Sequence, residues 1–392
     1  MLKGFSLFSN VGIAETYLHN YVDMIVANEL EPTRVKFYKE MYPNTNIIEG
    51  NILNDNIFNT IIDIAKENKC NFLIATPPCQ GMSIAGKKLE NDSRNFLITK
   101  VVEAIKLVKP KYFLIENVIA MPKTKIFINN KTITIKEYLE ENLLNDYNFS
   151  INYVNTKDYG IPQSRNRVIV LGTLKGFNEW KIPNTFFNEV TVREAISYLP
   201  SLESGEISEI KYHYAKKHMN EHILCMKHTP TGKTAFDNEI YYPKKINGDK
   251  IKGFKTSYKR IEWDKPAPTI TMSNGAISSQ NNVHPGRLKE DGTYSDARVL
   301  TLKEIFILSS LPDDWCPPIW ASENLIRNVI GEGIPPKFIE ILVKEIIETV
   351  SINKDVEEKN IKNLDSNNQS FIEDLLKRDV KVFENFAEEI IK

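Results

Sequence analysis

The chain opens with residues 3–12, KGFSLFSNVG, in which a short apolar run ends in a tight polar turn. Residues 13–21, IAETYLHNY, follow with the apolar spacing of a helix. Strand, turn and helix in this order open many nucleotide-binding βα units. Glu29 lies roughly twenty residues past the turn, where a carboxylate can accept hydrogen bonds from ribose hydroxyls. The stretch favours an α/β fold with a nucleoside site; the alternative is an ordinary α/β domain with an acidic loop.

The rest of the first half continues this alternation. Apolar residues recur at helical spacing over residues 96–108, and Pro110 ends that helix. Short apolar runs that alternate with helices predict an α/β fold with a doubly wound, mostly parallel sheet, in which ligands bind at the carboxyl ends of the strands. The strands expected after the first are residues 22–28, 46–48, 72–76, 112–115 and 168–171.

The composition is that of a globular protein. The 392 residues allow two or three domains, and a hydrophobic content of 42% excludes wholesale disorder. Because 50 Lys and Arg balance 51 Asp and Glu, any basic surface must be local. The 4 cysteines form no CxxC pair and are too few for a disulfide scaffold. With no signal-peptide pattern and no apolar run of membrane-spanning length, we expect a cytoplasmic protein without membrane contact.

The pattern changes at about residue 175. From there to residue 258 the sequence is polar, rich in turn dipeptides and without βα alternation. Helical apolar spacing returns over residues 302–311 and 338–350, and the tail is charged and amphipathic. We expect one domain over 1–174, a smaller irregular domain over 175–258, and a helical extension over 351–392 that caps the first domain.

Cys79 follows one of the expected buried strands in the loop Pro77-Pro78-Cys79-Gln80. The two prolines fix the backbone, so the direction of the thiol is set. Such a thiol at a strand end is a good candidate nucleophile, because its thiolate form adds to electron-poor centres. A buried structural thiol is the alternative.

Two further polar groups are expected at the same edge of the sheet. Glu116 and Asn117 follow a later strand. Gln163, Arg165 and Arg167 occupy every second position leading into another strand. Because successive side chains of a strand point to opposite faces, we expect all three to point the same way. A carboxylic acid can hydrogen-bond a ring nitrogen that gains charge, and arginines can hold an exocyclic oxygen or a phosphate. The alternative for the arginine pair is a surface strand with salt bridges.

In their order and spacing these residues resemble the DNA (cytosine-5)-methyltransferase family of bacterial and phage restriction systems. The resemblance extends from Phe5 to about Val350. The matching segments are Leu7-Phe8-x-x-x-Gly12, Asn28-Glu29, Gly50-Asn51-Ile52, Pro77-Pro78-Cys79-Gln80, Asp92-x-Arg94-Asn95, Lys109-Pro110-Lys111, Glu116-Asn117-Val118, Gln163-x-Arg165-x-Arg167, residues 260–270, His284-Pro285, Arg298-x-Leu300-Thr301-x-x-Glu304 and residues 330–336.

The resemblance implies the fold of S-adenosylmethionine-dependent methyltransferases. It makes residues 1–174 the catalytic and cofactor-binding domain, residues 175–258 the target-recognition domain, and residues 259–350 a hinge and return to the catalytic domain. The implied cofactor is S-adenosyl-L-methionine, and the implied cofactor-binding residues are Phe8, Gly12, Glu29, Asn51, Ile52, Pro78, Glu332 and Gly333.

Five positions depart from the family pattern near that cofactor site. Ser6 stands where the family usually has Asp, Asn10 where it has Gly, Ile13 where a second Gly is common, Asn51 where it has Asp, and Glu332 where it has Asn. Asn adopts positive φ more readily than other non-glycine residues, so Asn10 can keep the turn.

The resemblance also implies the reaction. Cys79 attacks C6 of a flipped cytosine, Glu116 stabilises charge at N3, and C5 is methylated before its proton leaves. Arg167 is the expected contact to the base and Arg165 its support. Further contacts to substrate DNA are implied for Gln80, Ser83, Asn117, Gln163 and Thr269.

Residues 175–258 carry many lysines with interleaved tyrosines, which is typical of nucleic-acid contacts and also of a solvated surface. Double-stranded DNA is the expected partner of a monomeric enzyme, with a cognate restriction endonuclease that acts separately. Methylation of tRNA, or DNA binding without turnover, are the alternatives. The spacing of His218 and His222 suggests one helix face and a zinc pair, but without a CxxC we expect no metal.

Overall fold

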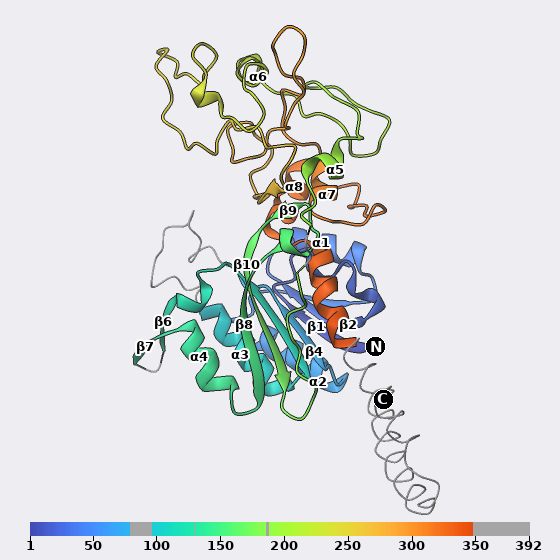
Figure 1. Cartoon of the computed structure of the whole chain (residues 1–392). Helices are drawn as coiled ribbons and strands as arrows, with labels where there is room; N and C mark the ends of the chain where they lie inside the picture. The colour runs from blue at the N-terminus through green and yellow to red at the C-terminus, as the bar shows by residue number, and fades with distance from the viewer. Residues whose placement is uncertain (79–95, 129, 186–187, 348–392) are drawn as a thin grey trace, which may run out of the picture.

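A computed structural model describes residues 1–78, 96–128, 130–185 and 188–347. Seven strands form one sheet in the order β3-β2-β1-β4-β5-β10-β8 (Figure 1). The pairings from β3 to β5 are parallel, and β10 is antiparallel to β5 and β8, so the predicted mostly parallel sheet is confirmed. The strands are β1 (Leu2–Leu7), β2 (Val22–Glu29), β3 (Asn46–Glu49), β4 (Phe72–Ala75), β5 (Tyr112–Asn117), β8 (Tyr147–Asn155) and β10 (Asn166–Leu174).

Helices cover both faces of this sheet, as expected for strands that are apolar on both sides. One face packs against α2 (Asp55–Glu67), α3 (Leu97–Val108) and α4 (Ile135–Leu143). The opposite face packs against Trp180 and a helix over residues 336–347, whose apolar side chains include Phe338 and Leu342. Helix α1 (Pro32–Met41) packs beside β2 and β3.

The first crossover differs from its prediction. Residues 13–21 form two 3-10 turns, Ile13–Glu15 and Leu18–Asn20, and the helix expected there is wrong. The side chain of Glu15 turns inward and hydrogen-bonds Ser6 of β1 and Tyr38 of α1. A regular helix needs its polar positions on the solvent side, so this buried carboxyl is incompatible with the amphipathic pattern that the sequence suggests.

A second lobe lies above the carboxyl ends of the strands and is largely irregular (Figure 1). It contains α6 (Asn220–Lys227), and its apolar core is small, formed by residues such as Met226, Tyr258 and Val283. That core includes Val299, so it extends past residue 258. Trp180 does not belong to this core, although it lies within the polar residues 175–258. It packs on the face of the sheet that the helix over residues 336–347 covers.

The two lobes meet at a junction of short elements. Helices α5 (Val192–Ile196), α7 (Leu302–Leu308) and α8 (Glu323–Glu332) share one apolar cluster with the first turn and α1. The helices predicted over residues 302–311 and 338–350 are confirmed as α7 and as residues 336–347, and α8 was not predicted. Strands β9 (Gln163–Ser164) and β11 (Ala267–Pro268) pair here in parallel.

Two smaller features complete the description. Strands β6 (Lys125–Ile128) and β7 (Lys131–Thr134) form an antiparallel pair beside α4. Among the described residues, no helix has both the length and the apolar character needed to cross a membrane. The extension predicted over residues 351–392 lies outside the described residues.

Candidate active site at the carboxyl ends of the strands

The turn after β1 has an unusual backbone. Phe8, Asn10 and Gly12 have φ values of 61°, 52° and 79°. The expectation that Asn10 adopts a positive φ in place of glycine is therefore confirmed. Gly12 cannot carry a side chain without cost, because a Cβ atom there would overlap the ring of Tyr42, whose hydroxyl donates to the Gly12 carbonyl at 2.8 Å.

The end of β2 is joined to this turn through Glu29. Its Oε2 accepts the backbone N–H of Asn10 at 2.9 Å, and its Oε1 accepts the N–H groups of Leu30 and Glu31. The side chain of Asn28 donates to the carbonyls of Ile48 and Gly50, which ties β2 to the end of β3. These bonds fix the ends of three neighbouring strands relative to one another.

Two candidate adenine contacts follow β3. The side chain of Asn51 is exposed, and its Oδ1 accepts the N–H of Leu53 at 3.0 Å. Ile52 is only 2% exposed and belongs to the apolar core beneath α2. Asn51 is thus the accessible member of the pair.

The end of α8 lies beside the first turn, as the resemblance implies. Asn10 Nδ2 donates to the Val329 carbonyl at 3.1 Å, and a Cβ on Gly333 would lie 2.7 Å from Cγ2 of Ile13. The carboxylate of Glu332 pairs with Arg34 of α1, with 2.6 Å between Oε2 and Nη1. Residues 330–336 therefore lie against the first turn and α1, through the contact of Gly333 with Ile13 and the ion pair of Glu332 with Arg34.

This arrangement suits the nucleoside part of the cofactor that the sequence implies. Asn10 Oδ1 is buried and has no hydrogen-bond partner among the described residues, so it offers an acceptor at the turn. Glu29 provides a second acceptor, fixed by backbone donors, at the end of the neighbouring strand. Bound ligands in open α/β sheets lie along this edge.

A second group of residues gathers at the ends of β4, β5 and β10. Arg167 Nε lies 2.7 Å from Glu116 Oε1, and both side chains are mostly buried, at 14% and 11% exposed. Asn117 Nδ2 donates to the Pro77 carbonyl at 2.9 Å, which anchors the start of the proline loop to β5. Pro78 is half-buried at the end of that segment. The predicted residues Cys79, Gln80 and Ser83 lie outside the described residues.

The motif Gln163-x-Arg165-x-Arg167 divides into two sets of contacts. Arg165 is 2% exposed and donates to the carbonyls of Ile270, Gly331 and Glu332 at 3.0, 3.0 and 2.8 Å. Gln163 is also buried, and its amide bonds the Ile270 N–H and the Leu308 carbonyl. These two residues hold the return segment, whereas Arg167 faces Glu116.

Thr269 belongs to the same junction. Its hydroxyl donates to the Ser164 carbonyl at 2.8 Å, next to the β9–β11 pairing. In this geometry the Thr269 side chain joins the return segment to β9, the short strand that directly precedes Arg165.

The histidines of the upper lobe have separate partners. His218 precedes α6, so the expectation that it shares a helix face with His222 is wrong. His218 Nε2 accepts the Val299 N–H, and His222 contacts the Tyr258 hydroxyl. No cluster of three His, Cys, Asp or Glu side chains arranged to hold a metal occurs within the described part of the chain.

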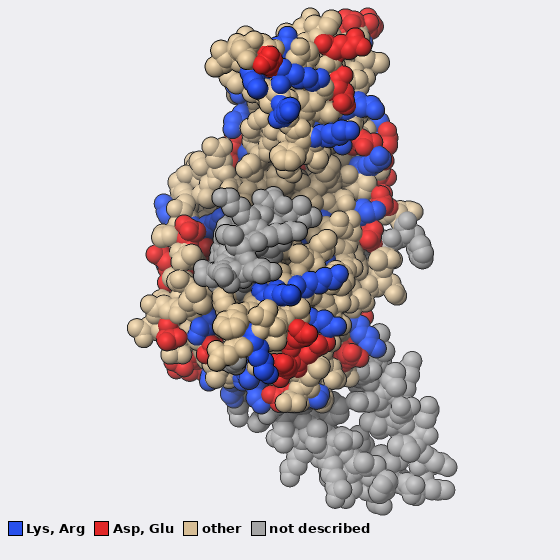
Figure 2. Space-filling model, turned by 90° about the vertical axis from the view of Figure 1, so that its left-hand side faces the viewer, with Lys and Arg blue, Asp and Glu red and all other residues tan. Residues whose placement is uncertain are grey.

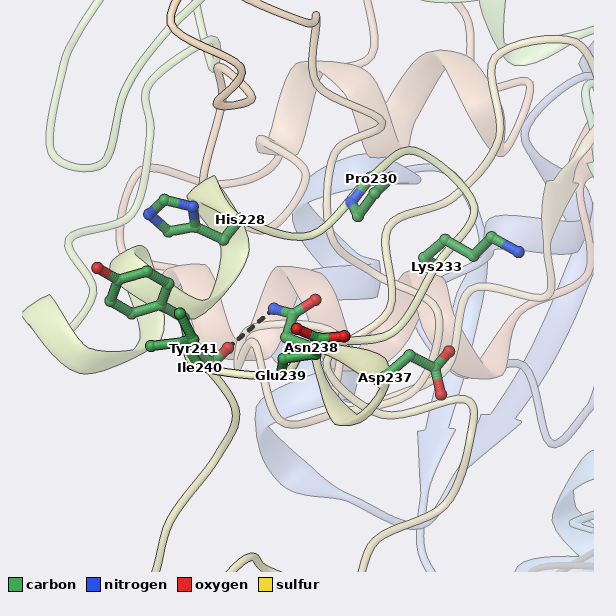
Figure 3. Close-up of a pocket in the computed structure, with 8 residues that line it drawn as sticks. All are labelled: His228, Pro230, Lys233, Asp237, Asn238, Glu239, Ile240 and Tyr241. Carbon is green, nitrogen blue, oxygen red and sulfur yellow. Dashed lines mark hydrogen bonds between the residues drawn. The ribbon is translucent and has the colours of Figure 1, made fainter.

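An open pocket of about 620 Å³ lies in the upper lobe, away from the strand ends (Figure 3). The rings of His228 and Tyr241 stack on one side of it at 4.0 Å, and Lys233 lies across from them. The pocket thus combines aromatic and charged groups in the lobe expected to recognise the target.

The sequence did not single out three residues of the first turn and its surroundings. Glu15 bonds Ser6 of β1 and Tyr38 of α1, and Arg34 pairs with Glu332 at the end of α8. Glu15, Tyr38 and Arg34 each lie in a stretch with an ordinary helical pattern. No short motif marks them. One clue was present in the sequence. Ser6 stands where the family usually has an acidic residue, and an acidic residue, Glu15, follows nine positions later.

Comparison with known proteins shows which family the chain resembles. The model of the C-5 cytosine-specific DNA methylases matches residues 2–348. The chain is 49% identical over 351 residues to the Type II methyltransferase M1.HgaI of Avibacterium volantium, which covers 88% of this chain and 98% of that protein. It is 28% identical over 333 residues to M1.HphI of Haemophilus parahaemolyticus, covering 83% and 80% of the two chains.

The fold is shared with a solved prophage-encoded DNA modification methyltransferase of Escherichia coli. That structure superposes with a TM-score of 0.65 at 18% identity and covers 90% of this chain and 100% of its own. The methyl donor of such enzymes is S-adenosyl-L-methionine. From the family match over nearly the whole length and the 49% identical relative, the chain belongs to the C-5 cytosine-specific DNA methylase family and is a DNA (cytosine-5-)-methyltransferase.

Proposed function

We propose that the protein is the modification enzyme of a Type II restriction system and methylates one cytosine within a specific duplex sequence. Its relatives M1.HgaI and M1.HphI are named Type II methyltransferases. The observation that supports the chemistry most directly is the Glu116–Arg167 pair, placed beside the segment that leads to Cys79 and anchored to it by Asn117.

In this proposal Cys79 is the nucleophile. Its thiolate forms a bond to C6 of cytosine, and the electron pair of the C5–C6 double bond moves into the ring toward N3. Glu116 supplies a hydrogen bond to N3, where that charge develops, and Arg167 orients the carboxyl group. Bound S-adenosylmethionine would supply the methyl group, which bonds to C5 through that electron pair, and would leave as the uncharged thioether. Loss of the C5 proton to water then restores the C5–C6 double bond as the sulfur of Cys79 leaves C6.

The target cytosine must leave the helix for this chemistry. C6 is stacked inside duplex DNA, and extrusion of the base costs a few kcal/mol. Arg165 is proposed as a support for the site, because its guanidinium is occupied by carbonyls of the return segment. Arg167 remains the proposed contact to cytosine O2 or its phosphate.

The upper lobe is the proposed target-recognition region. On the side that Figure 2 presents, Lys and Arg side chains gather on this lobe, with acidic side chains toward its edge. Lysines contact phosphates without regard to sequence, whereas base readout needs a few side chains in a groove. We propose that the protein works as a monomer and that its cognate endonuclease acts on its own.

A mechanism-based trap tests the proposal. A set of duplexes carrying 5-fluorocytosine is incubated with the protein and S-adenosylmethionine, because fluorine cannot leave C5 as a proton does. We expect a covalent protein–DNA adduct on a denaturing gel, whose peptide maps to Cys79. The variant Cys79→Ser should form no adduct and should still bind DNA.

Two controls separate the alternatives. An adduct on fluorinated tRNA but not on duplex DNA would replace the proposal by tRNA methylation. Cofactor and DNA binding without an adduct on either substrate would indicate a binding module without turnover.

A further inference from the structure

Glu15 is a buried carboxyl that the proposed reaction does not use. Its side chain is 5% exposed and lies beneath the turn that follows β1. Ser6 Oγ donates to Glu15 Oε1 at 2.5 Å, and the Tyr38 hydroxyl donates to Oε2. Ser9, which lies between Phe8 and Asn10 in the turn, donates to Ser6 Oγ at 2.8 Å. A chain of hydrogen bonds therefore links the turn to the carboxyl.

The direction of these hydrogen bonds depends on the charge of Glu15. As a carboxylate it accepts at both oxygens, and every hydroxyl in the chain has a partner. A protonated carboxyl must donate from one oxygen. If it donates toward Ser6, the hydroxyls of Ser6 and Ser9 must both reverse, and the Ser9 proton then points into the turn. The protonation state of Glu15 thus determines the direction in which the Ser6 and Ser9 hydroxyls donate, and so the hydrogen bonding at the turn.

Glu15 titrates close to neutral pH. Burial raises its pKa to about 7, against the opposing effect of the hydrogen bonds from Ser6 and Tyr38. The other titratable groups that face it are the phenols of Tyr38 and Tyr42, and burial raises the pKa of both. Neither phenol changes charge near neutrality, so Glu15 is the group of this cluster that does.

We propose that Glu15 is a positioning residue of the cofactor site, and that its ionised form favours the cationic S-adenosylmethionine over the uncharged thioether of the product S-adenosylhomocysteine. The proposal rests on the proposed placement of the cofactor at the Phe8–Gly12 turn. A buried negative charge under that turn lowers the free energy of a bound sulfonium through the low dielectric of the interior, while the thioether gains little from it.

The proposal predicts that cofactor binding is linked to proton release. Isothermal titration calorimetry of the full-length protein with S-adenosylmethionine at pH 6, 7 and 8 should show affinity rising by roughly threefold more than in Glu15→Gln across this range. The ligand ionises identically in both titrations, so the difference between the two proteins isolates Glu15. At pH 7, buffers of different ionisation enthalpy should reveal a fraction of a proton released by the wild type and less by the variant.

Three further measurements sharpen the test. S-Adenosylhomocysteine should show a much smaller difference between wild type and Glu15→Gln. Tyr38→Phe removes a hydrogen bond that lowers the pKa of Glu15, so the midpoint of the pH dependence should move to higher pH. The exposed Glu67→Gln, at the end of α2, is the matched control and should follow the wild type.

The outcomes distinguish two kinds of failure. Binding of S-adenosylmethionine with the same pH profile in wild type and Glu15→Gln would overturn the role of Glu15 and leave the proposed function intact. Absence of cofactor binding at every pH in a folded wild-type protein would overturn the placement of the cofactor itself. Equal effects on the cofactor and on the product would exclude the preference for the sulfonium.

Discussion

Arg167 Nε lies 2.7 Å from Glu116 Oε1, across the only antiparallel pairing that β5 makes in the seven-stranded sheet. Because both side chains are mostly buried, each restricts the rotamers of the other. The pair depends on the antiparallel direction of β10 relative to β5. An antiparallel β10 brings its first residues, rather than its last, to the edge where β4 and β5 end.

Glu116→Gln should therefore reduce methyl transfer far more than DNA binding. The amide keeps the size of the side chain but cannot donate a carboxyl proton to N3, and loss of a general acid commonly costs about 100-fold or more in rate. Single-turnover rates with labelled S-adenosylmethionine would measure this, with the dissociation constant for the same duplex determined in parallel. A variant that methylates at the normal rate would remove Glu116 from the reaction.

Arg165→Ala should act through folding. The guanidinium donates to three carbonyls of the return segment, two of them in fully buried hydrogen bonds, and loss of these donors should lower the free energy of unfolding by about 3 kcal/mol. Arg193 is the control, because its ion pair with Asp264 is exposed, and Arg193→Ala should destabilise the protein far less. Urea unfolding of the two variants would decide. Equal losses would contradict the structural role of Arg165.

Gly12→Ala should weaken cofactor binding as well as stability. A side chain at φ +79° is strained, and its Cβ would also overlap the ring of Tyr42. Gly292 has nearly the same φ, +80°, with open space around it. Gly292→Ala should thus carry the backbone strain alone and leave cofactor affinity unchanged, whereas Gly12→Ala should lower affinity by about tenfold or more. Calorimetry on both variants makes the comparison.

The junction of the two lobes should lose stability in acid. Burial alone would raise the pKa of Glu304, but the Arg298 charge at 2.8 Å and its hydrogen bonds hold that pKa at about 2. A carboxyl with a depressed pKa contributes stability above its unfolded pKa and loses it as the pH falls through the folded value. The free energy of unfolding should thus fall between about pH 4.5 and 2, and less steeply in Glu304→Gln.

How far the sequence predicts this fold depends on the kind of residue involved. Strands such as Phe72–Ala75 and Tyr112–Asn117 are buried on both faces, so their apolar runs are continuous and their ends are visible. Strand β8 is partly exposed along its length and was not predicted. The helix expected over residues 13–21 was wrong because the inward turn of Glu15 depends on Tyr38, a partner distant in sequence.

The candidate site divides in the same way. Glu116, Asn117 and Arg167 could be identified because their spacing follows strand ends, which local pattern reveals. The partners of Glu332 and Arg165 could not, since a salt bridge to Arg34 and bonds to carbonyls of the return segment depend on tertiary packing. A sequence shows which polar groups lie at the edge of a sheet, but only the packed structure shows which of them form hydrogen bonds or ion pairs with each other.

The helix over residues 336–347 has a consequence for synthesis on the ribosome. It covers the face of the sheet that carries Phe72, Leu114 and Leu171, yet it is translated after the entire upper lobe. A growing chain thus holds all seven strands while one apolar face still lacks its helix. The sheet domain is completed only after the upper lobe has been translated, so a chain that stops within that lobe leaves this apolar face without its helix.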